Sequence, residues 1–153
     1  MNDIMLITTL LFASVLYASQ RSLYFDFRRR ESMPEELKRA NLEMSEEEII
    51  LKKRGLFAKR RVDQVFIGKK GNWIIVDSKT RRRHEVKWND VLQISEYRAI
   101  LAETNKGIEL SSHGYIRTVT NPEEKDRRKL NVKYHKVELI SVSDALKLIE
   151  KNS

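Results

Sequence analysis

Two strand-like segments joined by a short polar turn lie in the middle of the chain. Residues 56–68 (LFAKRRVDQVFIG) and 73–80 (WIIVDSKT) are rich in β-branched and aromatic side chains, which favour extended structure. The four residues between them, KKGN at 69–72, have the composition of a tight turn. We therefore predict a β-hairpin over residues 56–80.

A helix and two further strands are expected after this hairpin. Residues 87–105 have the length and the apolar periodicity of a helix. Residues 113–120 and 129–140 have the pattern of strands. Ser141 and Asp144 then form the capping pattern of a last helix.

Upstream of the hairpin, the pattern favours helical structure. Residues 34–54 start with a proline near a capping serine. Ser45 and Glu48 form a second capping box, and Gly55 would end that helix. We expect one broken helix or two short helices here. The order helix, strand, strand, helix, strand, strand, helix predicts an α/β (α+β) domain with a small mixed β-sheet flanked by helices.

Residues 4–18 form an uncharged run at the N-terminus. The run is shorter than the roughly 20 residues that a membrane-spanning helix usually needs, but no polar face interrupts it. Basic residues begin only at Arg21, and the positive-inside rule then places the following domain in the cytoplasm. We expect residues 1–25 to be a hydrophobic anchor helix with its juxtamembrane segment, in a single-pass protein of the inner (cytoplasmic) membrane whose domain spans residues 26–153. The alternative is a core helix of a soluble domain.

Charge and cysteine content narrow the classes of partner and cofactor. The formal net charge is +8, and all thirty Lys and Arg residues lie after residue 20. A basic domain favours a polyanionic partner, either nucleic acid or an anionic membrane surface, although a solvated basic surface is an equal alternative. The chain has no cysteine, which excludes disulfides, thiolate zinc sites and Cys-ligated iron–sulfur clusters.

Charged residues follow the apolar part of the strand over 73–80. Alternate side chains of a strand share a face, so Asp77 and Lys79 point the same way. Asp63 lies in the preceding strand, where the hairpin can bring it near Asp77. Two carboxylates and a backbone carbonyl such as that of Ser78 are oxygen ligands that suit Mg²⁺. A metal held this way can activate water at a phosphodiester, with Lys79 stabilising the developing charge. The plain alternative is a surface ion pair.

Three motifs in order resemble the PD-(D/E)xK nuclease superfamily, in its RecB-like and Cas4-like branch. They are RRVDQVF, WIIVDSKT and QISEY, and Gln93 and Tyr97 of the last share a helix face. The resemblance implies that Asp63 and Asp77 are metal ligands and that Lys79 is the catalytic lysine. It also implies that Gln93 and Tyr97 support the site or contact DNA.

The resemblance covers roughly residues 43–140 and extends to fold and cofactor. It implies a restriction-endonuclease-like core and Mg²⁺ or Mn²⁺ as the cofactor, without the iron–sulfur cluster of Cas4 proteins because the cysteines are absent. The family usually has GRxD where this chain has RRVD, and it takes an acidic ligand or histidine from its first helix. Glu46, expected on the inward face of a helix with Ile49 and Ile50, is the candidate for that ligand.

A basic segment directly follows the candidate catalytic strand. Its residues Arg81, Arg82, Arg83 and Lys87 are candidates for gripping DNA phosphates, and a solvated loop is an equal alternative. The leading hypothesis is a membrane-tethered, metal-dependent deoxyribonuclease. The alternatives are a non-catalytic membrane-tethered DNA-binding module and a membrane adaptor with a basic face. DNA and the membrane are the expected partners, and a homo-oligomer or other protein subunits are left open.

Overall fold

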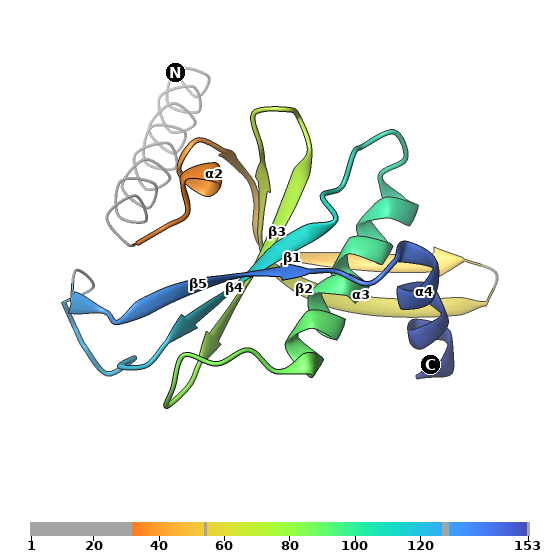
Figure 1. The fold of residues 1–153 in the computed structure, drawn as a ribbon. Helices are drawn as coiled ribbons and strands as arrows, with labels where there is room; N and C mark the ends of the chain where they lie inside the picture. The colour runs from red at the N-terminus through yellow and green to blue at the C-terminus, as the bar shows by residue number, and fades with distance from the viewer. Residues whose placement is uncertain (1–31, 54, 127–128, 153) are drawn as a thin grey trace, which may run out of the picture.

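The computed structural model describes residues 32–53, 55–126 and 129–152, which form one mixed five-stranded sheet with helices on both faces (Figure 1). Its strands are β1 (Asn41–Lys53), β2 (Leu56–Ile67), β3 (Trp73–Thr80), β4 (His113–Val119) and β5 (Val132–Glu138). They lie side by side in chain order, and only the β3–β4 pair is parallel. The prediction of an α/β domain around a small mixed sheet is confirmed.

Three helices cover the two faces of this sheet. The long helix α3 (Trp88–Thr104) crosses one face, and α4 (Val142–Lys151) packs beside it (Figure 1). The short helix α2 (Glu35–Lys38) covers the other face, where Leu37 is buried. Ser141 caps α4 as expected, since its hydroxyl oxygen accepts a hydrogen bond from the Asp144 backbone N–H at 3.1 Å.

Strand β3 is buried on both faces, which explains its nearly continuous apolar run. Ile75 packs on the α3 face with Ile94, whereas Ile74 and Val76 pack on the α2 face. Strand β4 pairs in parallel with the edge of β3 that is opposite to β2, so β3 is an interior strand. The residues that end this run, Asp77 to Lys79, therefore lie where the pairing of β3 with β2 ends and its pairing with β4 continues.

The expected helix over residues 34–54 is wrong except at α2. Residues 41–53 instead form β1, which pairs with β2 along almost its whole length. Gly55, with a φ of +84°, lies in the turn between these strands rather than at a helix end. Ile49 and Leu51 are buried and Ile50 is exposed, the alternation of a strand with one face against the core.

The expected anchor helix over residues 1–25 lies outside the described residues. Within the described ranges, no helix is long and apolar enough to cross a membrane.

Candidate active site

Asp63 and Asp77 lie opposite each other just beyond the last paired residues of β2 and β3. The paired register of β2 and β3 ends at Gln64–Val76, so the next positions on the two strands are Asp63 and Asp77. Beyond this point, the Ser78 backbone N–H donates to Asp63 Oδ2 at 2.7 Å instead of to a β2 carbonyl. The two carboxylates that the sequence paired are therefore neighbours on the face covered by α3.

Asp77 is a carboxylate with almost no access to solvent. Its side chain is 2% exposed, and Oδ2 lies 2.8 Å from Lys79 Nζ. That contact lacks hydrogen-bond geometry, so Oδ2 is buried without a hydrogen-bond partner among the described residues. Burial raises the pKa of Asp77 to about 6, against the opposing effect of Lys79, and the nearby Asp63 charge raises it further. The site therefore holds negative charge that its own protein groups do not fully satisfy.

Lys79 is held by a chain of polar groups on α3. Its Nζ donates to Gln93 Oε1 at 2.7 Å, and Gln93 Nε2 donates in turn to the Tyr97 hydroxyl. Tyr97 is buried, and burial raises its pKa to about 12, so the phenol stays neutral at physiological pH. Gln93 and Tyr97 thus share a helix face, as their spacing of four predicts, and Gln93 is the one that contacts Lys79.

The oxygen atoms of Asp63, Asp77 and the Ser78 carbonyl are of the kind that binds a divalent cation, although they are few. No cluster of three or more His, Cys, Asp or Glu side chains is arranged around a metal position in the described parts of the chain. The N–H and C=O of one residue in an extended strand point to the same side. Because the Ser78 N–H points toward Asp63, the Ser78 carbonyl also points toward β2. Asp63, Asp77 and this carbonyl are the groups that could hold a metal ion.

Glu46 lies on a strand, so its predicted place on a helix is wrong. In the β1–β2 register it falls between Ser45–Gln64 and Glu47–Val62, opposite Asp63. Its φ of +56° is uncommon for a residue other than glycine and marks an irregularity in the strand. The Glu46 carboxylate is exposed and lies 3.2 Å from Arg61 Nε. The backbone of Glu46 is therefore near the site, but its side chain forms an ion pair with Arg61.

Arg81 is not free to grip DNA. One guanidinium nitrogen donates to both carboxylate oxygens of Asp90, at 2.6 and 2.7 Å, and both side chains are largely buried. Asp90 also accepts from the Lys87 backbone N–H, so it fastens the loop after β3 to the start of α3. The sequence signal for this role was an acidic residue in the first helical turn, and our sequence analysis missed it. Arg82, Arg83 and Lys87 are exposed, as a phosphate contact requires.

Two histidines far apart in the sequence meet beside this site. His84 Nδ1 and His135 Nε2 lie 2.7 and 3.0 Å from the hydroxyl of Thr118. Thr118 is the β4 partner of Lys79, so this group adjoins the lysine on the same face of the sheet. Sequence spacing alone does not show this arrangement, because three separate segments build it.

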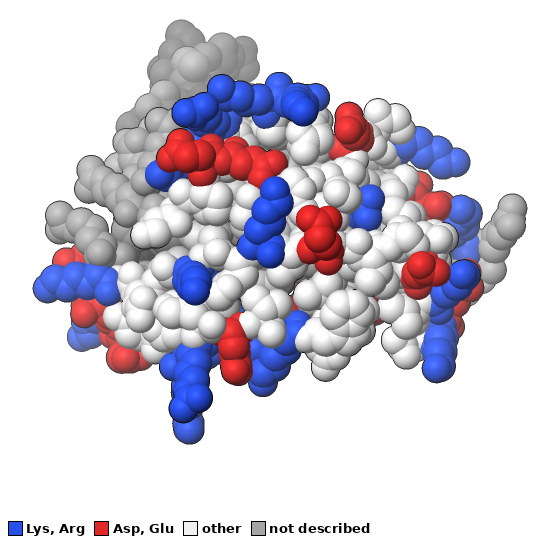
Figure 2. All heavy atoms as spheres, in the orientation of Figure 1, with Lys and Arg blue, Asp and Glu red and all other residues white. Residues whose placement is uncertain are grey.

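The positive charge of the domain does not form one continuous surface on the face shown in Figure 2. Among the described residues of that face, Lys and Arg side chains are interspersed with Asp and Glu. Net charge by itself is therefore a weak argument for a DNA path across this face.

Replacing Arg81 by Ala should destabilise the fold by about 3–5 kcal/mol, because it leaves the Asp90 carboxylate buried without its partner. The exposed Arg82→Ala is the matched control and should change the free energy of unfolding by less than about 0.5 kcal/mol. Urea unfolding of the full chain in detergent, followed by tryptophan fluorescence, measures both. Equal effects would show that Arg81 is an ordinary surface residue and restore it as a phosphate contact.

Comparisons with known proteins identify no family for the chain. No family model matches it, and no curated protein matches it. Among solved structures, the chain is similar to one described as the crystal structure of SSO0001, with 14% identity and a TM-score of 0.45. The match covers 91% of this chain and 59% of that one, so the chain spans little more than half of its length.

Proposed function

We propose that the protein is a metal-dependent deoxyribonuclease tethered to the inner (cytoplasmic) membrane, with its catalytic domain in the cytoplasm. The observation that carries the proposal is the buried Asp77 carboxylate next to Asp63. Its Oδ2 lies 2.8 Å from Lys79 Nζ but has no hydrogen-bond partner among the described residues. In a surface ion pair the carboxylate would be solvated. Asp77 is only 2% exposed, so it does not fit that description. A restriction-endonuclease-like core is part of the same proposal.

Mg²⁺ or Mn²⁺ would be held by Asp63, Asp77 and the Ser78 carbonyl. The unsatisfied Oδ2 of Asp77 fits this assignment, since a divalent cation offsets the cost of burying a carboxylate. When bound, such a metal polarises a phosphate oxygen and lowers the pKa of a coordinated water. The Ser78 N–H donates to Asp63 Oδ2 and so orients this carboxylate, which keeps further lone pairs for a cation.

Lys79 would stabilise charge that develops on the phosphate. Gln93 accepts one of its hydrogen bonds and Asp77 lies against it, so the ammonium is fixed before substrate arrives. Tyr97 holds Gln93 in place from within the core. The exposed Arg82, Arg83 and Lys87 follow directly after β3 and would contact the flanking DNA phosphates.

One observation favours the alternative, a non-catalytic membrane-tethered DNA-binding module. The described residues bring only two carboxylates to the site, and Glu46 points to Arg61. Glu36 of α2 does not supply a third, because its partners His113 and Tyr115 tie it to the far end of β4. A site that binds DNA but lacks a full ligand set would bind without cleaving.

Asp77→Asn should abolish metal binding while stabilising the metal-free protein. Folding raises the pKa of this carboxyl, so its ionisation lowers the stability of the fold. The loss begins when the pH rises above the pKa that Asp77 has in the unfolded chain, and it is complete above about pH 6. At pH 7.5 the neutral amide should therefore raise the metal-free melting temperature by a few degrees. Differential scanning fluorimetry of the full chain in detergent, with EDTA or with Mn²⁺, measures both effects. If Mn²⁺ leaves the melting temperature of the wild-type protein unchanged, the proposed metal site is refuted.

Lys79→Ala should slow DNA cleavage by about 10²–10³-fold with little change in DNA affinity, because the ammonium acts mainly in the transition state. The exposed Lys125→Ala is the matched loss of one positive charge and should cleave at the wild-type rate. Labelled single- and double-stranded DNA, with Mn²⁺ or with EDTA, report cleavage and binding in parallel. DNA binding without cleavage in any metal would favour the tethering module, and cleavage in excess EDTA would refute the metal mechanism.

The full-length chain should fractionate with membranes and resist carbonate extraction. The reason is the uncharged run over residues 4–18, followed by basic residues. Replacing two of its leucines, Leu10 and Leu11, by Asp should move the protein to the soluble fraction. The intact protein in the soluble fraction would instead mean that this run belongs to a soluble core.

A further inference from the structure

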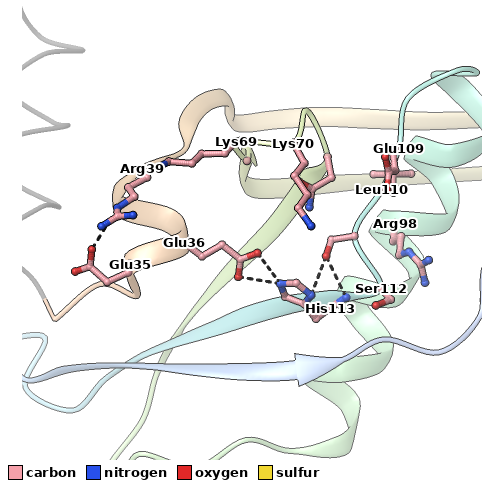
Figure 3. A pocket seen from close by; sticks show the side chains of 13 residues that line it. Glu35, Glu36, Arg39, Lys69, Lys70, Arg98, Glu109, Leu110, Ser112 and His113 are labelled. Atoms are coloured by element: carbon pink, nitrogen blue, oxygen red, sulfur yellow. Dashed lines mark hydrogen bonds and ion pairs between the residues drawn. The ribbon is translucent and has the colours of Figure 1, made fainter.

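A hollow of about 620 Å³ lies at the end of β3 opposite to the candidate active site (Figure 3). Four segments line it: helix α2, the turn between β2 and β3, the middle of α3 and the residues just before β4. The turn precedes β3 and Lys79 lies near its end, so about 20 Å of strand separates the two places. The hollow therefore shares no side chain with the proposed nuclease site.

Three cations at this hollow lack a carboxylate partner. Lys69 and Lys70 extend from the turn, and no hydrogen bond or ion pair joins either side chain to the described residues. Arg98 of α3 donates from Nη1 to the Ile140 carbonyl at 3.2 Å, but its Nε is buried without a hydrogen-bond partner in the described structure. Burial lowers the pKa of Arg98. Among the described residues, these three cations form no ion pair with a carboxylate.

The carboxylates of α2 at the hollow already have partners within the fold. Glu35 lies 2.8 Å from Lys38, and Glu36 Oε2 accepts from the Tyr115 hydroxyl at 2.7 Å. Glu36 also contacts His113 Nε2 at 3.0 Å, as the dashed lines in Figure 3 show. Although burial opposes it, the hydrogen bonds from Tyr115 and His113 hold the pKa of Glu36 below its usual value. Of the lining carboxylates, this leaves Glu109 without a cationic partner among the described residues.

Hydroxyl and imidazole groups lie on the same side of the hollow as Lys70. Figure 3 shows Lys70 reaching from the turn toward His113 and Ser112, with Arg98 beyond them. The His113 ring is fixed at both nitrogens, because Nδ1 lies 2.9 Å from Ser111 Oγ and Nε2 faces Glu36. The hollow thus offers ammonium, guanidinium and hydroxyl donors from the segments that line it.

We propose that this hollow binds the phosphate group of a small phosphate monoester. A phosphate dianion has enough acceptor oxygens for the two lysines and for the guanidinium of Arg98, which lines the hollow. The volume is within the range of small-molecule sites, so it leaves room for an organic group beyond the phosphate. A compound the size of a mononucleotide fits both requirements, and Glu109 is available to its hydroxyl or amine donors.

Isothermal titration of the full chain in detergent and EDTA, with dAMP and with inorganic phosphate, tests the proposal. The double variant Lys69→Ala/Lys70→Ala should weaken dAMP binding at least about tenfold, since charge-assisted hydrogen bonds to phosphate are lost. Lys125→Ala/Lys129→Ala removes the same charge from another exposed loop and should bind as the wild type does. All four lysines are exposed, so both variants should fold, and circular dichroism checks this.

The remaining outcomes separate this hollow from the proposed nuclease site. Lys79→Ala should leave dAMP binding intact; if it abolishes binding while Lys69→Ala/Lys70→Ala does not, dAMP sits at the nuclease site and this proposal fails. Equal losses in the two double variants would show only general charge attraction and would also overturn it. Tighter binding of dAMP than of inorganic phosphate supports a monoester, whereas binding of inorganic phosphate alone refutes one.

Discussion

The buried carboxylate of Asp77 is the constraint around which the centre of the molecule is arranged. An ionised carboxylate away from water is costly unless charges and donors surround it, and among the described residues only Lys79 forms an ion pair with Asp77. The cost falls at the end of an interior strand that is otherwise apolar on both faces. Gln93 and Tyr97 then hold Lys79 where it offsets part of that cost. A residue that weakens its own fold in this way is typical of functional sites.

Helix α3 connects this constraint with the rest of the fold. Its first turn is joined to the loop after β3 by the ion pair of Asp90 with Arg81. The middle of α3 places Gln93 and Tyr97 near the end of β3 that carries Asp77 and Lys79. The next residue, Arg98, lines the hollow at the other end of β3. One helix therefore positions an acidic site and a basic hollow at the two ends of one strand. The unlike charges of the two ends favour unlike ligands, a cation at one and an anion at the other.

Residues 41–53 show where local patterns mislead. Ser45, Glu48 and Gly55 fit a helix with two caps, yet the segment is a strand. The reason is tertiary: β2 offers an unpaired edge along the whole segment, and pairing with it buries Ile49 and Leu51 against the α3 core. Short apolar clusters such as EIIL fit either period, so the neighbouring strand decided the outcome. This pairing also put Glu46 opposite Asp63 on a neighbouring strand, in a backbone conformation that no sequence pattern indicated.

The hairpin of β2 and β3, helix α3 and the shared face of Asp77 and Lys79 can all be predicted from the amino-acid sequence, because turn composition and side-chain period are local properties of the chain. The proximity of Gln93 and Tyr97 can be predicted in the same way, since a spacing of four places two residues on one helix face. The burial of Asp77, the ion pair of Arg81 with Asp90 and the position of Lys70 and Arg98 around one hollow follow from the packing of distant segments. Burial and ion pairing depend on which segments pack together, and residues distant in the chain make those contacts.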